Sequence, residues 1–265
     1  MERADSQPVT LEIFDGPTLV RRYASTDTAM APADIGNVPR YWIRPTRVLS
    51  AAPGMHRFVW DLRYPEPRVL NTQYPISATP ANTAREPRGP WVVPGTYSVR
   101  LTVNGRTYTQ PLTVRMDPRV KASSATLARQ FTLAKGLYDD IGRARAALDS
   151  VRALRASLRQ LRGRTPELAA AVDSLDRAAG AVEGAGGGPG GGGAASATPT
   201  LAGLIGQLGQ LYDALQDADV APTTQLVAAV QAAQRDVSPA IARWTTLRSR
   251  AADRLGAQLR PGGTR

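Results

Sequence analysis

The side chains able to carry out chemistry in this chain are few. His56 is the only histidine and no cysteine is present, so thiolate nucleophiles, iron–sulfur clusters and metal sites built on paired histidines are excluded. A glycosidase needs only two carboxylates, and Asp61, Glu66, Glu86 and Asp117 are available. Nothing in their spacing indicates that two of them meet in a cleft. We therefore expect no catalytic residue, no metal ion and no cofactor.

Aromatic rings offer a second kind of site, because sugars stack on flat ring faces. Trp60 shares one face of an alternating run with Phe58 and is expected in the core. Trp91 stands between prolines in a predicted loop, where an indole can be exposed. The candidate contacts for a glycan or a partner protein are Trp91, Trp42 and Tyr74.

A stripe of arginines is the third candidate. At 3.6 residues per turn, one flank of a predicted helix carries Arg145, Arg152, Arg155, Arg159 and Arg162. Such a stripe could meet phosphate groups, but long side chains beside an apolar seam also cover apolar surface as a solvated flank. No recognition motif, interleaved aromatic residue or basic tail accompanies the stripe, so we do not expect it to bind nucleic acid.

The first part of the chain has the composition of a β domain. Residues 1–119 hold 15 of the 21 prolines and 11 of the 15 aromatic residues. Alternating apolar residues predict hairpins over 9–20 and 97–116, the second closed by an Asn-Gly pair that favours a type I′ turn. A similar run at 56–62 predicts a central strand, and the proline-rich stretch 69–94 predicts an extended surface loop. Together these elements predict an antiparallel immunoglobulin-like β-sandwich, with a barrel as the alternative.

The second part has the composition of a helical bundle. Residues 120–183 and 198–260 carry Leu, Ala and Val at steps of three and four, and each segment predicts a helical hairpin. Ser123 or Ser124 can cap a first helix of about 40 residues. A helix of that length needs antiparallel partners to cover its apolar face.

Two further segments complete the predicted organisation. Residues 184–197 are rich in glycine and predict a flexible linker, because the Gly-Lys-Ser/Thr of a phosphate-binding loop is missing. Residues 261–265 predict a frayed tail. The expected fold class is α+β with two domains, a sandwich followed by a long-helix antiparallel bundle.

The charge balance is basic: 33 Lys and Arg residues against 22 Asp and Glu residues give a net charge of +11. That charge would suit an anionic partner, but the predominance of Arg, Ala, Gly and Pro is also what a GC-rich genome produces. The first residues lack the apolar run of a signal peptide, and no stretch reaches the roughly 20 apolar residues of a membrane span. We expect no export signal and no membrane span in this chain.

Two runs carry a resemblance to a known family. The sequences GMHRFVWDLRYP at 54–65 and GPWVVPGTYSVRLTVNGRTYTQPLTVRMDPRV at 89–120 closely resemble the C-terminal part of bacterial sortilin-like BNR-repeat proteins, which are often labelled glycosyl hydrolase or sialidase-like. In that family a β-propeller precedes an immunoglobulin-like module similar to FlgD, here VTLEIFDGPTLVRRY at 9–23, and a helical tail follows. The resemblance implies a location outside the cytoplasm, periplasmic or secreted.

The resemblance also limits which properties of the family can be expected of this chain. The Asp-box pattern of BNR repeats is absent from the 265 residues, so a glycosidase activity of the family would reside in a propeller upstream, and no catalytic residue is transferred. We expect a non-catalytic accessory region that supports or docks the propeller or another protein. The alternatives are a carbohydrate-binding or glycosidase-associated domain that uses exposed aromatic residues, and binding of an anionic surface or nucleic acid through the arginine stripe.

Overall fold

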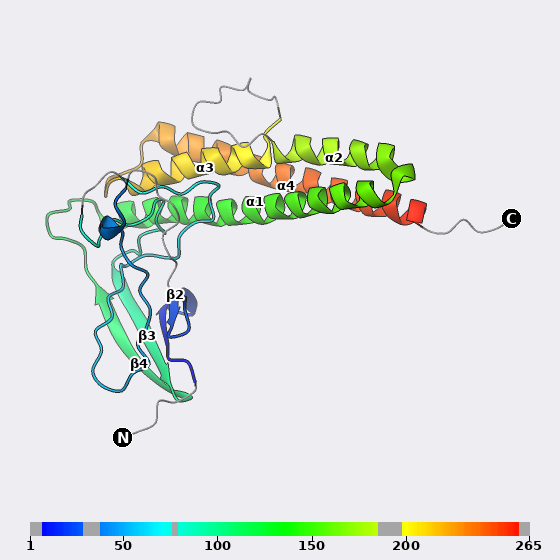
Figure 1. Ribbon diagram of the computed structural model, residues 1–265. Coiled ribbons are helices and arrows are strands. Elements are labelled where there is room, and N and C mark those ends of the chain that lie inside the picture. The colour runs from blue at the N-terminus through cyan, green and yellow to red at the C-terminus, as the bar shows by residue number, and fades with distance from the viewer. Residues whose placement is uncertain (1–6, 29–37, 76–78, 185–197, 260–265) are drawn as a thin grey trace. The chain divides into compact units, whose positions relative to one another are not determined.

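The computed structural model describes residues 7–28, 38–75, 79–184 and 198–259, and it is an α+β structure (Figure 1). Within these residues lie four antiparallel strands and four α-helices. The strands are β1 (Thr10–Asp15), β2 (Thr18–Ala24), β3 (Gly95–Val103) and β4 (Arg106–Val114), and the helices are α1 (Ser124–Arg164), α2 (Ala169–Glu183), α3 (Leu201–Gln216) and α4 (Thr224–Leu259).

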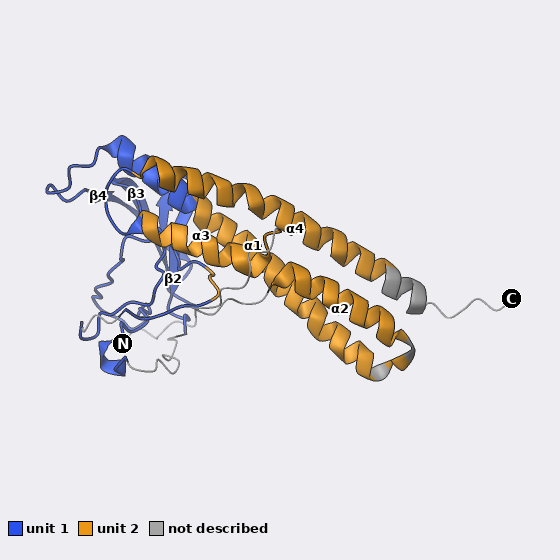
Figure 2. Cartoon of the chain, turned by 90° about the horizontal axis from the view of Figure 1, so that it is seen from above, with its two compact units in different colours: residues 1–67, 71–135, 216–221 blue, residues 68–70, 136–215, 222–265 orange. Residues whose placement is uncertain are grey.

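The chain forms two compact units (Figure 2). The β unit comprises residues 1–67, 71–135 and 216–221, and the helical unit comprises the remainder. The units do not divide the chain at one point, because residues 124–135 of α1 and the segment that follows α3 belong to the β unit.

The four strands form one sheet in the order β2-β1-β3-β4. Both predicted hairpins are confirmed: β1 pairs with β2, and β3 pairs with β4 from Gly95↔Val114 to Val103↔Arg106. Asn104 and Gly105 adopt φ values of 52° and 72°, the positive values that a type I′ turn requires. The central pair β1 and β3 runs antiparallel and joins the two hairpins.

The strand predicted over 56–62 is not formed. Residues 56–61 join no ladder, and Leu62 adopts a φ of 58°, which breaks an extended run. Phe58 and Trp60 nevertheless pack against the core of the β unit and are partly buried, so the alternation correctly predicted which side chains face the core. Outside the sheet, the described residues show only isolated bridges, such as Arg63↔Trp91.

The core of the β unit lies between one face of the sheet and these irregular segments. Ile13, Val20 and Tyr97 come from the strands, while Tyr64 and Val92 come from the segments. The edge of the Trp60 ring meets Tyr97 at a centroid distance of 5.8 Å. Apolar contact rather than a second hydrogen-bonded ladder therefore fixes the segments that carry residues 58–64 and 91–94.

Side-chain hydroxyls define three helix starts. Ser123 Oγ accepts from the Thr126 N–H at 3.1 Å, so the first helix is capped at one of the two predicted positions. Thr223 Oγ1 accepts from the Leu226 N–H at 3.2 Å at the start of the last helix. Helix α3 is capped by Thr200, whose Oγ1 accepts from the Gly203 N–H at 3.2 Å.

The helical unit packs its helices side by side along their apolar faces (Figures 1 and 2). One cluster joins Leu158 of α1, Val172 and Leu175 of α2, and Ala251 of α4. None of the described helices combines the length and apolarity that crossing a bilayer requires.

Candidate functional site

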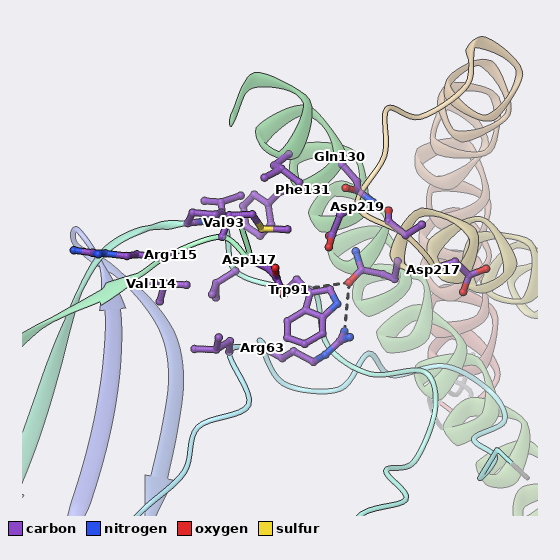
Figure 3. A pocket seen from close by; sticks show the side chains of 17 residues that line it. Arg63, Trp91, Val93, Val114, Arg115, Asp117, Gln130, Phe131, Asp217 and Asp219 are labelled. Carbon is purple, nitrogen blue, oxygen red and sulfur yellow. Dashed lines mark hydrogen bonds between the residues drawn. The ribbon is translucent and has the colours of Figure 1, made fainter. Parts of the chain in front are cut away.

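A pocket of about 490 Å³ opens within the β unit (Figure 3). That volume falls in the range typical of sites for small ligands or peptide side chains. Its walls come from five stretches of the chain: residues 62–63, 91–94, 114–117, three residues of the first turns of α1 (Leu127, Gln130 and Phe131), and residues 216–219. The apolar residues among them are Leu62, Trp91, Val92, Val93, Pro94, Val114, Met116, Leu127, Phe131 and Ala218.

Arg63 and Trp91 form one wall. The Arg63 guanidinium carbon lies 3.6 Å from the centroid of the Trp91 ring, a cation–π contact. Arg63 is only 7% exposed, and its Nη1 donates to the Gly89 carbonyl at 2.7 Å. Trp91 remains 41% exposed, so one face of the indole is fixed by Arg63 while part of the ring faces solvent.

Gln216 ties the segment after α3 to this wall. Its Oε1 accepts from the Trp91 backbone N–H at 3.1 Å and from Arg63 at 3.5 Å, as the dashed lines in Figure 3 show. A further bond holds the same segment from the other side, because Gln130 Nε2 donates to the Ala218 carbonyl at 2.7 Å. Residues separated by as many as 153 positions are thereby fixed around one cavity.

Three carboxylates line the pocket: Asp117, Asp217 and Asp219. Asp117 follows β4 and pairs with Arg119, whose side-chain and backbone hydrogen bonds hold the pKa of the carboxyl below its ordinary value. Asp217 and Asp219 are exposed and have no ion-pair partner among the described residues. Carboxylates at the mouth accept hydrogen bonds or pair with cations, while the walls accept apolar groups.

Tyr97 supports the pocket from the core. It is 3% exposed and its hydroxyl donates to the carbonyl of Val93, a lining residue, at 2.6 Å. Burial, with smaller contributions from Asp15 and Tyr64, raises the pKa of Tyr97 to about 12. The phenol therefore remains a hydrogen-bond donor at all ordinary pH values.

The three predicted aromatic contacts do not share one site. Trp91 lies in the pocket, whereas Trp42 and Tyr74 do not line it. Trp42 is half-buried, with its ring edge toward Tyr41 at 5.9 Å. Tyr74 is also half-buried.

The arginine stripe makes ion pairs within the helical unit. Arg155 contacts both carboxylates that face it from α2, Asp176 at 2.7 Å and Glu183 at 2.6 Å. The hydrogen bonds from Arg155 lower the pKa of Asp176; for Glu183, burial acts upward but the bonds from the stripe outweigh it, so its pKa is lowered too. Two further pairs are Arg152–Glu183 and Arg162–Asp173.

The remaining stripe residues differ in their surroundings. Arg145 pairs with Asp149 on its own helix at 2.9 Å and donates to the Val69 carbonyl. Arg159 is exposed and acts on Asp176 only through its charge. Since most of the stripe already has carboxylate partners, its side chains stabilise the contact of α1 with α2 rather than presenting a free cationic surface.

The solitary histidine lies apart from the pocket. His56 is exposed, and its Nε2 lies 2.7 Å from the Ala52 carbonyl. The described part of the chain also contains no group of three His, Asp or Glu side chains able to hold a metal ion.

The sequence indicated Trp91 but missed its neighbours. Arg63 was one arginine among many, and Asp217 and Asp219 follow a helix that the pattern assigned to the bundle. A short acidic run in a chain with a net charge of +11 was the available signal for the last two. The sequence did not indicate that three aspartates line one pocket.

Comparisons with known proteins give no match to a family model, a curated protein or a solved structure.

Proposed function

We propose that this chain is a non-catalytic binding module that takes up a polypeptide segment of a partner protein in the pocket of the β unit. The observation that carries the proposal is the combination of apolar walls with a partly exposed indole fixed by Arg63. Rigid, partly exposed tryptophans with arginine neighbours are typical anchors of protein–protein contacts. Because Arg63 and Gln216 hold Trp91 in place, little side-chain freedom is lost on binding.

The setting we propose is an accessory region of a sortilin-like BNR-repeat protein outside the cytoplasm, with an immunoglobulin-like sandwich as its β domain. The partner would be the propeller or another protein at the same location. Support comes from the position of the resembling stretches, because residues 54–65 and 89–120 contribute Leu62, Arg63 and the walls on either side of Trp91. The residues that suggest the family are thus also the residues that build the pocket.

A second candidate is glycan binding at Trp91. The exposed part of its ring could stack on a sugar, and the nearby carboxylates could accept hydrogen bonds from hydroxyl groups. The predominance of apolar residues in the walls favours the polypeptide, because sugar hydroxyls facing those walls would lose hydrogen bonds to water.

The test is a selection of displayed peptides on the intact chain, repeated on the Trp91→Ala variant. We expect peptides enriched on the wild type to lose binding on Trp91→Ala and to keep it on Tyr41→Ala, which removes a ring that is 70% exposed and does not line the pocket. A peptide panel that binds both variants equally would contradict the proposed site.

A parallel assay distinguishes the alternatives. Soluble polysaccharides that quench tryptophan fluorescence in the wild type but not in Trp91→Phe would favour the glycan. Turnover of a glycoside that disappears in Asp219→Asn would overturn the non-catalytic proposal altogether.

A further inference from the structure

Resting on the proposed function, we infer that the pocket selects a segment in which a lysine or arginine accompanies an apolar side chain. Basic residues outnumber acidic residues 33 to 22 in the chain, whereas the charged residues that line the pocket are three aspartates, Asp117, Asp217 and Asp219, and two arginines, Arg63 and Arg115. Acidic residues are therefore in slight excess in the lining, although basic residues are in excess in the whole chain.

The cations near the pocket are already engaged or directed elsewhere. Arg63 is buried against Trp91 and bonded to the Gly89 carbonyl and Gln216. Arg119 makes its hydrogen bonds to Asp117. Arg115 is exposed and extends away from the labelled acidic residues in Figure 3.

The carboxylates of Asp217 and Asp219 are left for an incoming cation. Asp217 directly follows Gln216, the last residue of α3, and Asp219 lies two residues further along the chain. The C-terminal end of a helix carries partial negative charge. Since one face of the Trp91 ring is occupied by Arg63, the incoming cation is expected at the carboxylates and its aliphatic stem against the apolar wall.

The geometry of an extended chain fits two such contacts. Residues i and i+2 of an extended segment project to the same side, so an apolar side chain can enter the pocket while a basic one reaches its mouth. The volume of about 490 Å³ accommodates an apolar side chain together with the stem of its neighbour.

The experiment measures fluorescence anisotropy with three labelled peptides that share the core Leu-Ser-X-Ser-Leu, where X is Lys, Gln or Glu. We expect the Lys peptide to bind most tightly, although a net charge of +11 would by itself favour the Glu peptide. Non-specific electrostatic attraction therefore predicts the opposite order, which makes the comparison decisive.

The second part of the experiment removes the negative charges of Asp217 and Asp219. The double variant Asp217→Asn, Asp219→Asn is expected to weaken the Lys peptide roughly tenfold, to flatten its salt dependence and to leave the Gln peptide unchanged. The matched control is Asp236→Asn, an exposed residue of α4 that does not line the pocket. Circular dichroism checks that each variant is folded.

The outcomes separate the two proposals. If all three peptides bind equally, or the Glu peptide binds best, the charge preference is wrong while a peptide-binding pocket stands. If none of the three binds, both this inference and the proposed function fail. If binding of the Lys peptide survives the double variant unchanged, the contact with Asp217 and Asp219 is wrong.

Discussion

The guanidinium of Arg63 lies over the ring of Trp91, 3.6 Å from its centroid, and the same guanidinium donates to the Gly89 carbonyl. Arg63 thus joins the segment that ends in the core at Tyr64 to the segment that carries the exposed indole. Because Arg63 is buried and hydrogen-bonded, it already holds its position before a ligand binds. The wall of the pocket exists before binding.

Arg63→Met should destabilise the β unit. The substitution removes a cation–π contact and a charge-assisted hydrogen bond, which together are worth about 2–3 kcal/mol. Urea unfolding followed by tryptophan fluorescence measures the change. Arg115→Met, which alters an exposed arginine of the same pocket, should shift stability by less than about 0.5 kcal/mol. Equal losses of stability in the two variants would show that the Arg63–Trp91 contact contributes no more to stability than an exposed arginine does.

Gly89→Ala should be among the most disruptive single-methyl additions in the chain. A Cβ at this position would lie 1.9 Å from the Tyr64 carbonyl oxygen and 2.4 Å from that of Pro65, so backbone must move. We expect a loss of about 2–4 kcal/mol together with loss of peptide binding. Gly95→Ala is the control, since its Cβ would meet nothing within 4 Å. A Gly89→Ala protein as stable as the control would contradict the close packing of these two segments.

Tyr97 should make stability fall at alkaline pH. Its folded pKa of about 12 exceeds the ordinary value of 10.0, so its contribution is complete below pH 10 and is lost as pH rises toward 12. Tyr97→Phe should lower stability at neutral pH by about 1 kcal/mol, through the lost bond to Val93, and should reduce the alkaline loss. Urea midpoints across this pH range measure both effects. Tyr108→Phe alters an exposed ring and should leave the alkaline loss intact; an identical result for Tyr97→Phe would refute the argument.

The ion pairs between α1 and α2 should make stability fall in acid. The pKa values of Asp176 and Glu183 are lowered in the folded chain, so their contribution is present above the ordinary values of 3.8 and 4.5 and is lost as pH falls through the folded values. Arg155→Met should cost about 2 kcal/mol at neutral pH and should reduce the acid-dependent loss.

The control for the acid effect is Arg159→Met, on the same helix. Arg159 is exposed and acts on Asp176 through charge alone, so its removal should change stability by less than about 0.5 kcal/mol. Unfolding midpoints at neutral and acidic pH compare the two variants. If stability depends on acidic pH in the same way in the wild type and in Arg155→Met, the ion pairs of Arg155 do not hold α1 and α2 together.

Local patterns predicted the parts of the fold that local physics determines. The Asn104-Gly105 turn, the two hairpins and the cap at Ser123 each follow from a few adjacent residues. The run at 56–62 was misassigned because alternation reports which side chains face a core, and Phe58 and Trp60 pack partly buried against the core without a strand partner. Periodicity therefore predicted the packing correctly and the hydrogen bonding incorrectly.

The candidate site could be predicted only in part, for a related reason. Trp91 was recognisable from its proline-flanked position, but Gln216 reaches it across 125 residues of intervening chain. No spacing rule links such positions, because their meeting depends on how α3 ends and where β3 begins. The same holds for the three carboxylates, which become one feature only when the chain is folded.

The most direct test of the binding pocket uses 19F NMR of protein labelled with 5-fluorotryptophan. The chain has four tryptophans, which single Trp→Phe substitutions assign. On titration with the Lys peptide, we expect the resonance of Trp91 to shift and saturate while those of Trp42, Trp60 and Trp244 stay in place. A saturable shift of another tryptophan, with Trp91 unmoved, would contradict the account.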